Sequence, residues 1–184
     1  MTITNTGRMA QTVTPTAAIP LYGRSADNIR DHRHVTSLLH RIETTDIGVL
    51  VTPTLSFDER GHQVNHMTYY CVGWSGNGEK PVDFYPTAED FVGEGGNFER
   101  PYAIVKNAEG VKAGTRIEGL EAVGGLHFSE VTLEPEEECS YLIFTGITED
   151  IQEIRNLSKT YTTREMVLEA VSYTHLRAHE TLRH

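Results

Sequence analysis

The chain has 184 residues, enough for one domain with a sizeable core, and its 38% hydrophobic and 23% charged residues are typical of an ordinary globular protein rather than a disordered one. Its formal net charge of -10 argues against a nucleic-acid partner, because neutralising phosphates requires a basic surface. No apolar run approaches the length of a membrane span, and the first residues lack the pattern of a secretory signal. We therefore expect a cytoplasmic protein without a membrane partner, whose two cysteines, Cys71 and Cys139, are reduced and buried.

The first predicted elements are short strands. Residues 2–6 alternate around Ile3 and end at a turn, which indicates a strand. Residues 11–19 are rich in threonine and valine but contain Pro15, which favours an edge or bulged strand. Residues 47–52 form an apolar, β-branched run, which is typical of a strand buried on both faces.

Between these strands, residues 21–41 concentrate polar chemistry more than any other part of the chain. Charged side chains are costly to bury unless they are paired. We therefore expect the charged side chains of this stretch to form a positioning network, either a structural salt-bridge cluster or a ligand-facing surface. A short helix at 26–30 and an extended run at 34–39 are both compatible with its pattern. The candidate binding or docking residues are Arg30, Asp31, His32, Arg33 and His34.

His32 and His34 would share one face of a strand, as two zinc ligands must. No third ligand stands at a predictable spacing, so we expect a hydrogen-bonded structural pair and no metal. The acidic residues give no catalytic pair that can be named, and no nucleophile motif or nucleotide-binding loop is present. No catalytic residue and no cofactor are therefore assigned to this chain.

The middle of the chain continues the strand pattern. Residues 64–74 predict a strand, Gly76-Asn77-Gly78 predicts a hairpin turn, and residues 82–86 predict another short strand. A helix is expected to begin after Thr87 and to end at the glycine cluster 93–96, for which a structural turn is favoured over a backbone that approaches a sugar. The single tryptophan, Trp74, is interpreted as a core residue rather than a sugar-stacking platform.

The last third predicts strands and then helix. Residues 102–105, 119–123, 126–133 and 140–147 are interpreted as strands of an antiparallel sandwich, the last of them central, and residues 149–170 have helical spacing. Residues 171–181 resemble the translation of a transposon adapter used to prepare DNA sequencing libraries. Residues 171–184 are therefore set aside as an artefact.

Four stretches, residues 21–41, 52–62, 84–96 and 121–148, carry a family resemblance that extends over about residues 3–170. The amino-acid sequence of these stretches resembles the amino-terminal β-sandwich of the cellobiose phosphorylase family. Within that family, it most resembles the β-1,2-oligoglucan phosphorylase-like members. The resemblance implies a mainly β fold, an antiparallel, galactose-mutarotase-like super-sandwich with a short helical segment near the carboxyl end. It also implies a sandwich domain at residues 1–148, incomplete at its amino terminus, and the first linker helices at 149–170.

In that family the catalytic acid and most of the phosphate site belong to a helical barrel beyond this sequence. The resemblance thus implies the non-catalytic sandwich of an inverting phosphorylase, with inorganic phosphate as co-substrate, a β-glucan or disaccharide as substrate and a homodimeric parent. Residues 30–34 would reach sugar hydroxyls or, as we favour, pin the sandwich against the barrel. A sizeable exposed apolar patch is also expected where the barrel docks. The alternative is a freestanding carbohydrate-binding, lectin-like sandwich.

Overall fold

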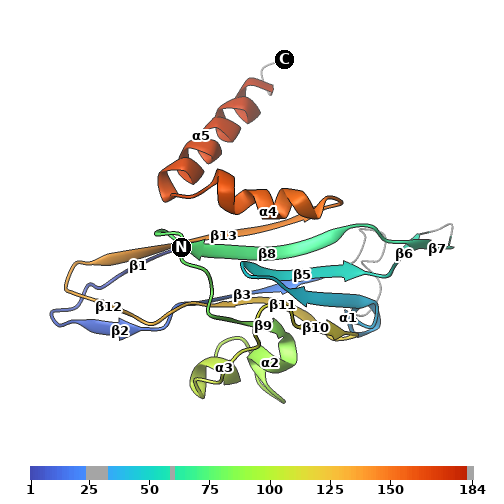
Figure 1. Ribbon diagram of the computed structural model, residues 1–184, viewed down its shortest axis with the longest axis horizontal. Coiled ribbons are helices and arrows are strands. Elements are labelled where there is room, and N and C mark those ends of the chain that lie inside the picture. Colours follow the sequence, from blue (N-terminus) through green and yellow to red (C-terminus); the bar gives the residue numbers. More distant parts are fainter. Residues whose placement is uncertain (24–32, 59–60, 182–184) are drawn as a thin grey trace.

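The structure is a computed structural model, and it describes residues 1–23, 33–58 and 61–181, without the side chains of residues 33–34, 57–58, 62 and 173–181. Two facing sheets form its centre, with helices on both outer sides (Figure 1). The strands of the six-stranded sheet are, in order, β1 (Thr2–Thr4), β13 (Glu138–Thr148), β8 (Thr68–Ser75), β5 (Gly48–Pro53), β4 (His40–Thr44) and β10 (Arg116–Glu118).

The second layer is a three-stranded antiparallel sheet with β11 in its middle. Its strands are, in order, β3 (Thr16–Leu21), β11 (Ala122–His127) and β9 (Asp83–Thr87). Two further pairs extend the ends of the sandwich: β12 (Val131–Leu133) with β2 (Gln11–Val13), and β6 (Leu55–Asp58) with β7 (Gly61–Val64).

The main core lies between the two sheets. Val49, Val51 and Cys71 from the six-stranded sheet pack with Phe84 and Leu126 from the three-stranded sheet, and all five are almost completely buried. The sheets come so close at one point that a Cβ on Gly124 would collide with the side chain of Cys71. Burial of these apolar side chains is the main driving force for bringing the two layers together.

Helices cover the outer face of each sheet (Figure 1). On the six-stranded sheet, α4 (Ile151–Thr160) buries Ile154 against a cluster that contains Trp74 and Leu142. It begins at Asp150, whose side chain accepts a hydrogen bond from the Gln152 amide, and α5 (Arg164–Thr181) follows it. On the three-stranded sheet lie α2 (Ala88–Val92) and α3 (Tyr102–Val105), while α1 (Arg33–Ser37) precedes β4.

The predicted mainly β, antiparallel sandwich with helices near its carboxyl end is confirmed. Strands form at residues 2–4, 48–53 and 83–87 as expected, and β5 is buried on both faces. The strand predicted at 140–147 is β13, but it is central only at its start, because β1 pairs with residues 138–140 and, among the described strands, β8 alone pairs with the rest.

One predicted strand is wrong, because residues 102–105 form the short helix α3. Pro101 precedes it with φ of -66°, and the amides of Ile104 and Val105 donate to the Pro101 carbonyl. Only Ala103 of α3 is buried. A four-residue apolar run has no resolvable period, so here the preceding proline and the tertiary contact of one alanine determine the helix.

The Gly76-Asn77-Gly78 turn forms, with Gly78 at φ of 83°, but the predicted hairpin is wrong. β8 already has β5 and β13 as its two neighbours, so the chain leaves this sheet after the turn and continues as β9 in the other layer. The glycine-rich turn residues determined the local reversal of the chain, but they did not determine which strand pairs with β8.

Several predicted boundaries shift. Pro15 separates two strands, β2 and β3, that belong to different sheets, and the predicted 64–74 strand is split because β7 ends at Val64 and β8 begins at Thr68. The predicted 126–133 strand is likewise divided between β11 and β12. Towards the carboxyl end, α5 continues through Thr181, so the residues set aside as a foreign tail are helical up to that point. None of the helices within the described ranges combines the length and apolar character that a membrane crossing requires.

Candidate functional site

A groove of about 670 Å³ opens beside the three-stranded sheet, next to the charged stretch that the sequence singled out. Its walls come from the end of β3, the start of β11, α2 and the glycine loop that follows α2. Tyr22 and Ser37 both line it, and these two residues flank most of the stretch that holds the candidate site residues. The described ends of that stretch therefore lie at the groove.

The glycine loop is built by the sequence around α2. The Thr87 hydroxyl caps the helix by accepting from the Asp90 amide at 3.0 Å, and Gly93 ends it at φ of 79°, a conformation that favours glycine. A Cβ on Gly96 would collide with the Val92 carbonyl oxygen. The close backbone approach allowed by this cluster is thus to its own helix, which supports the interpretation of a structural turn.

The groove combines carboxylates with exposed aromatic rings. Glu89, Glu94 and Glu121 line it, and its described lining contains no lysine or arginine. Tyr22 and Phe98 line it as well, and they are 45% and 48% exposed. Carboxylates accept hydrogen bonds from hydroxyl groups and aromatic faces pack on apolar C–H surfaces, so the chemistry suits a neutral polyol or an apolar protein surface better than an anion.

Under the groove lies His40, the last histidine of the charged stretch and only 2% exposed. Its Nδ1 is 3.1 Å from the Leu120 carbonyl oxygen, so Nδ1 carries the proton and donates it. Nε2 faces the Gly23 backbone without a hydrogen bond of good geometry. Burial lowers the His40 pKa below its ordinary value, although the Leu120 and Gly23 backbones and the charge of Glu121 act in the opposite direction. A neutral imidazole therefore sits beneath the groove at pH 7.

Only part of the predicted site can be placed. Arg30, Asp31 and His32 lie outside the described residues. Arg33 and His34 begin α1, so His34 stands on a helix and not on the strand that a same-face histidine pair would need. Within the part of the chain that the structure describes, no group of three or more His, Cys, Asp or Glu side chains is arranged to hold a metal ion.

Arg41, at the end of the same stretch, has a structural role. Its Nε lies 3.4 Å from Oε2 of Glu118, a cross-strand ion pair between β4 and β10, and its Nη1 donates to the His40 carbonyl oxygen at 3.0 Å. Both side chains of the ion pair are largely exposed, so we assign it little stability.

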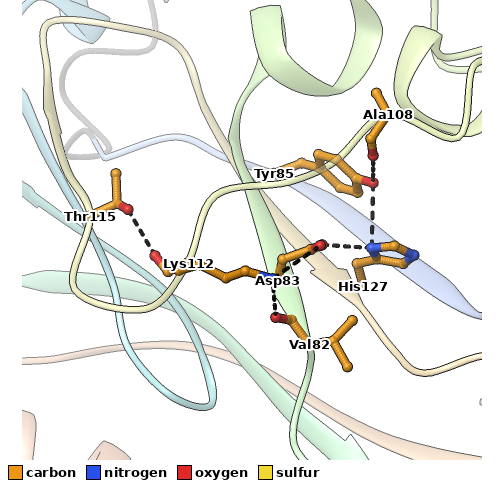
Figure 2. A network of polar contacts seen from close by, with 7 residues as sticks. All are labelled: Val82, Asp83, Tyr85, Ala108, Lys112, Thr115 and His127. Atoms are coloured by element: carbon orange, nitrogen blue, oxygen red, sulfur yellow. Dashed lines mark hydrogen bonds and ion pairs between the residues drawn. The ribbon is translucent and has the colours of Figure 1, made fainter.

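A second polar cluster, which the sequence did not indicate, joins β9, β11 and the loop at 106–115 (Figure 2). His127 Nδ1 lies 2.6 Å from Asp83 Oδ1, and the Tyr85 hydroxyl donates to the Ala108 carbonyl oxygen at 2.6 Å. Lys112 Nζ lies 3.9 Å from Asp83 Oδ2. Burial, and secondarily the charge of Asp83, raises the pKa of Tyr85 to about 12, so its hydroxyl stays protonated.

This cluster holds a loop against β9. The loop pairs with β9 through reciprocal backbone hydrogen bonds of 2.9 Å between Phe84 and Val111, beside the Asp83–His127 pair. The available sequence signal was one ionisable residue, Asp83 or His127, in each of two largely apolar strands. Its partners are 44 residues apart, so their meeting depends on which strands become neighbours.

Trp74 is confirmed as a core residue, 2% exposed. Its ring stacks on Phe144 with centroids 5.1 Å apart, and its Nε1 donates to the Tyr161 carbonyl oxygen at 3.0 Å. Trp74 therefore joins β8 to the end of α4 and is not available to a ligand.

With this geometry established, comparison with known proteins gives one family. The model of the glycosyl hydrolase 94 supersandwich domain matches residues 1–164, which include every strand of the two sheets and α4. No curated protein matches the chain at a significant level.

Proposed function

Because the chain belongs to the glycosyl hydrolase 94 supersandwich family, we propose that it is the non-catalytic sandwich of a phosphorylase that cleaves β-glucosidic bonds with inversion. The family match over residues 1–164 is the observation that carries the proposal. The substrate of the complete enzyme would be a β-glucan or disaccharide, with inorganic phosphate as co-substrate and without a further cofactor.

The chemistry of that reaction supports a non-catalytic role for this chain. An inverting phosphorylase needs a general acid at the departing sugar oxygen and cationic or amide donors that hold the attacking phosphate. The buried carboxylate Asp83 is held by His127 and Lys112. The groove offers glutamates such as Glu89 but, among its described lining residues, no lysine or arginine to hold phosphate. Both catalytic functions would therefore come from a separate domain.

The sandwich would dock against that domain around the groove. Tyr22, Phe98 and Leu120 line the groove and are 39% to 48% exposed. Beside them, α1 and its following turn expose Val35 and Leu38 by 54% and 64%. Exposed apolar residues grouped in this way favour a protein contact, which agrees with the apolar patch expected for a docking face.

The test is phosphate-dependent release of glucose 1-phosphate from β-glucans and disaccharides. We expect no product from the purified chain alone, and product when the chain is joined to a helical catalytic domain of the family. Phe98→Ser should weaken co-purification with that domain, whereas Val64→Ser, at a still more exposed apolar position on β7, should not. Phosphorolysis by the chain alone would contradict the proposal.

A second candidate function, glycan binding by the sandwich itself, is favoured by the pairing of carboxylates and aromatic rings in the groove. Its test is titration calorimetry with β-linked gluco-oligosaccharides. Binding that is lost in Tyr22→Ala and Phe98→Ala and kept in Val64→Ala would support this function, and absence of heat in the wild-type chain would reject it.

A further inference from the structure

A crevice of about 430 Å³ lies between α4 and the turn that joins β4 to β5. α4 covers the outer face of the six-stranded sheet, so the crevice and the groove beside α2 are on opposite outer sides of the sandwich (Figure 1). None of its described lining residues belongs to β1 or α5, and all of them lie within the residues that match the family. The crevice is therefore formed by the sandwich and α4 alone, and it has the size of a small-molecule site.

The α4 wall of the crevice is cationic. Arg155 and Lys159 line it from successive turns of the helix, where residues four apart are neighbours. Neither side chain has a hydrogen-bond or ion-pair partner among the described residues. A guanidinium donates two parallel hydrogen bonds to phosphate oxygens, and the ammonium adds a second positive charge. Two unpaired cations side by side therefore fit the two charges of a phosphate group better than the single charge of a carboxylate.

The opposite wall carries carboxylates that are already paired. Asp46 pairs with Lys80, which also lines the crevice, and Glu43 pairs with Arg116 at 3.5 Å. These partners reduce the repulsion that the two carboxylates would exert on an anion. Each carboxylate has about four acceptor positions, so it can still accept hydrogen bonds from hydroxyl groups. This wall therefore suits a polyol.

The floor between the two walls is apolar. Ile47, Leu50 and Ile154 form it, and all three are at most 6% exposed, whereas Ile151 at its border is 41% exposed. An apolar floor packs against the C–H surface of a ligand. It also lowers the local dielectric constant, which strengthens the ionic contacts at the rim.

We propose that this crevice binds a small polyhydroxylated phosphate ester, a sugar phosphate. Arg155 and Lys159 hold the phosphate group, and the hydroxyl groups donate to Asp46 and Glu43 on the other wall. The C–H surface of the sugar lies over the apolar floor beside Ile151. Inorganic phosphate would leave the carboxylate wall unused, and a neutral sugar would leave both cations unpaired. The site is separate from the groove and does not rest on the proposed function.

The test is titration calorimetry of the purified chain with glucose 6-phosphate, inorganic phosphate and glucose at physiological ionic strength. We expect glucose 6-phosphate to bind, inorganic phosphate to bind roughly tenfold or more weakly, and glucose to give no measurable heat. Absence of glucose 6-phosphate binding would overturn the proposal. Inorganic phosphate or glucose that binds as tightly as the ester would overturn it as well.

A charge-matched pair of variants identifies the cations. Arg155→Gln combined with Lys159→Gln should weaken glucose 6-phosphate binding roughly tenfold or more, because both contacts to the phosphate lose their charge. Arg100→Gln combined with Lys106→Gln changes the net charge equally at two exposed positions outside the crevice, and it should keep the wild-type affinity. Equal losses in the two double variants would overturn the proposal by showing a response to net charge alone.

Amide chemical shifts locate the ligand on the wild-type chain and decide the question if a variant fails to fold. Glucose 6-phosphate should shift the amides of both walls, at Thr45 and Asp46 and at Arg155 and Lys159. The amides of the glycine loop at 93–96, which borders the groove, should stay unchanged. Shifts confined to one wall, or centred on the glycine loop, would overturn the proposal.

Discussion

Nδ1 of His127 and Oδ1 of Asp83 lie 2.6 Å apart across the β9–β11 pair, with side chains that are 15% and 7% exposed. A carboxylate this buried is stable only when it is paired, and the imidazole supplies the hydrogen bond. Lys112 links the same carboxylate to the loop at 106–115, and the Tyr85 hydroxyl links His127 to the Ala108 carbonyl oxygen of that loop (Figure 2). The pair therefore stabilises the outer edge of the three-stranded sheet.

Asp83→Asn should lower the free energy of unfolding by about 1–3 kcal/mol, because it keeps the shape of the side chain and removes the charge that His127 and Lys112 face. The measurement is urea unfolding followed by circular dichroism at pH 7. Asp46→Asn is the control, since Asp46 pairs with Lys80 on the surface and should cost at most about 1 kcal/mol. Equal losses in the two variants would show that the buried pair has no special role.

Docking of α4 can be followed by Trp74, the only tryptophan. Ile154→Ala should cost about 2–5 kcal/mol, because Ile154 is 2% exposed and its removal leaves a cavity between α4 and the sheet. Ile151→Ala, on the same helix but 41% exposed, should have little effect. The readout is unfolding monitored by Trp74 fluorescence, with a red-shifted native emission if α4 separates in the Ile154 variant. If the two alanine variants behave alike, α4 does not pack as described.

Gly124→Ala tests the close approach of the two sheets. The added methyl group would meet Cys71, so we expect a loss of about 1–3 kcal/mol or more from overpacking. Gly114→Ala is the control: its φ of 88° causes strain of about 1–2 kcal/mol, but a methyl group there meets no neighbour.

The Cys71 thiol distinguishes these two effects. Burial raises the Cys71 pKa to about 12, so in a Cys139→Ser background the folded protein should react very slowly with a disulfide reagent at pH 8. Gly124→Ala should make that thiol reactive by displacing it, and Gly114→Ala should not. Equal reactivity in both variants would mean that the methyl group at residue 124 is accommodated without displacing Cys71.

Local signals in the sequence were sufficient where one element carried all the information. The β-branched run at residues 47–52 predicted a strand buried on both faces, which is β5, and the Thr87 cap with Gly93 delimited α2. The family resemblance supplied the architecture, which alternation alone could not have distinguished from other antiparallel sandwiches.

What the sequence did not predict depends on contacts between distant segments. The groove is formed by Tyr22, Phe98 and Leu120 from three separate parts of the chain, and neither their periodicity nor their spacing indicates that they meet. The partner of β8 after its glycine turn was mispredicted for the same reason: a turn fixes the direction of the chain, whereas the choice of a neighbouring strand is made by the packing of the whole sandwich.

His40 predicts the direction in which stability depends on pH. Because burial lowers its pKa in the folded state, the unfolded chain binds the proton more readily. The stabilisation from a neutral His40 is complete above its ordinary pKa near 6.5 and is lost as the pH falls towards the folded-state value. The slope from this one group is at most about 1.4 kcal/mol per pH unit.

The measurement is urea unfolding of the wild type and of His40→Asn between pH 5 and 8. Asparagine can still donate to the Leu120 carbonyl oxygen but does not titrate, so the variant should lose stability less steeply as the pH falls. A steeper decline in His40→Asn than in the wild type would mean that the protonated imidazole is the form that the folded protein prefers, with Nε2 donating to the Gly23 backbone.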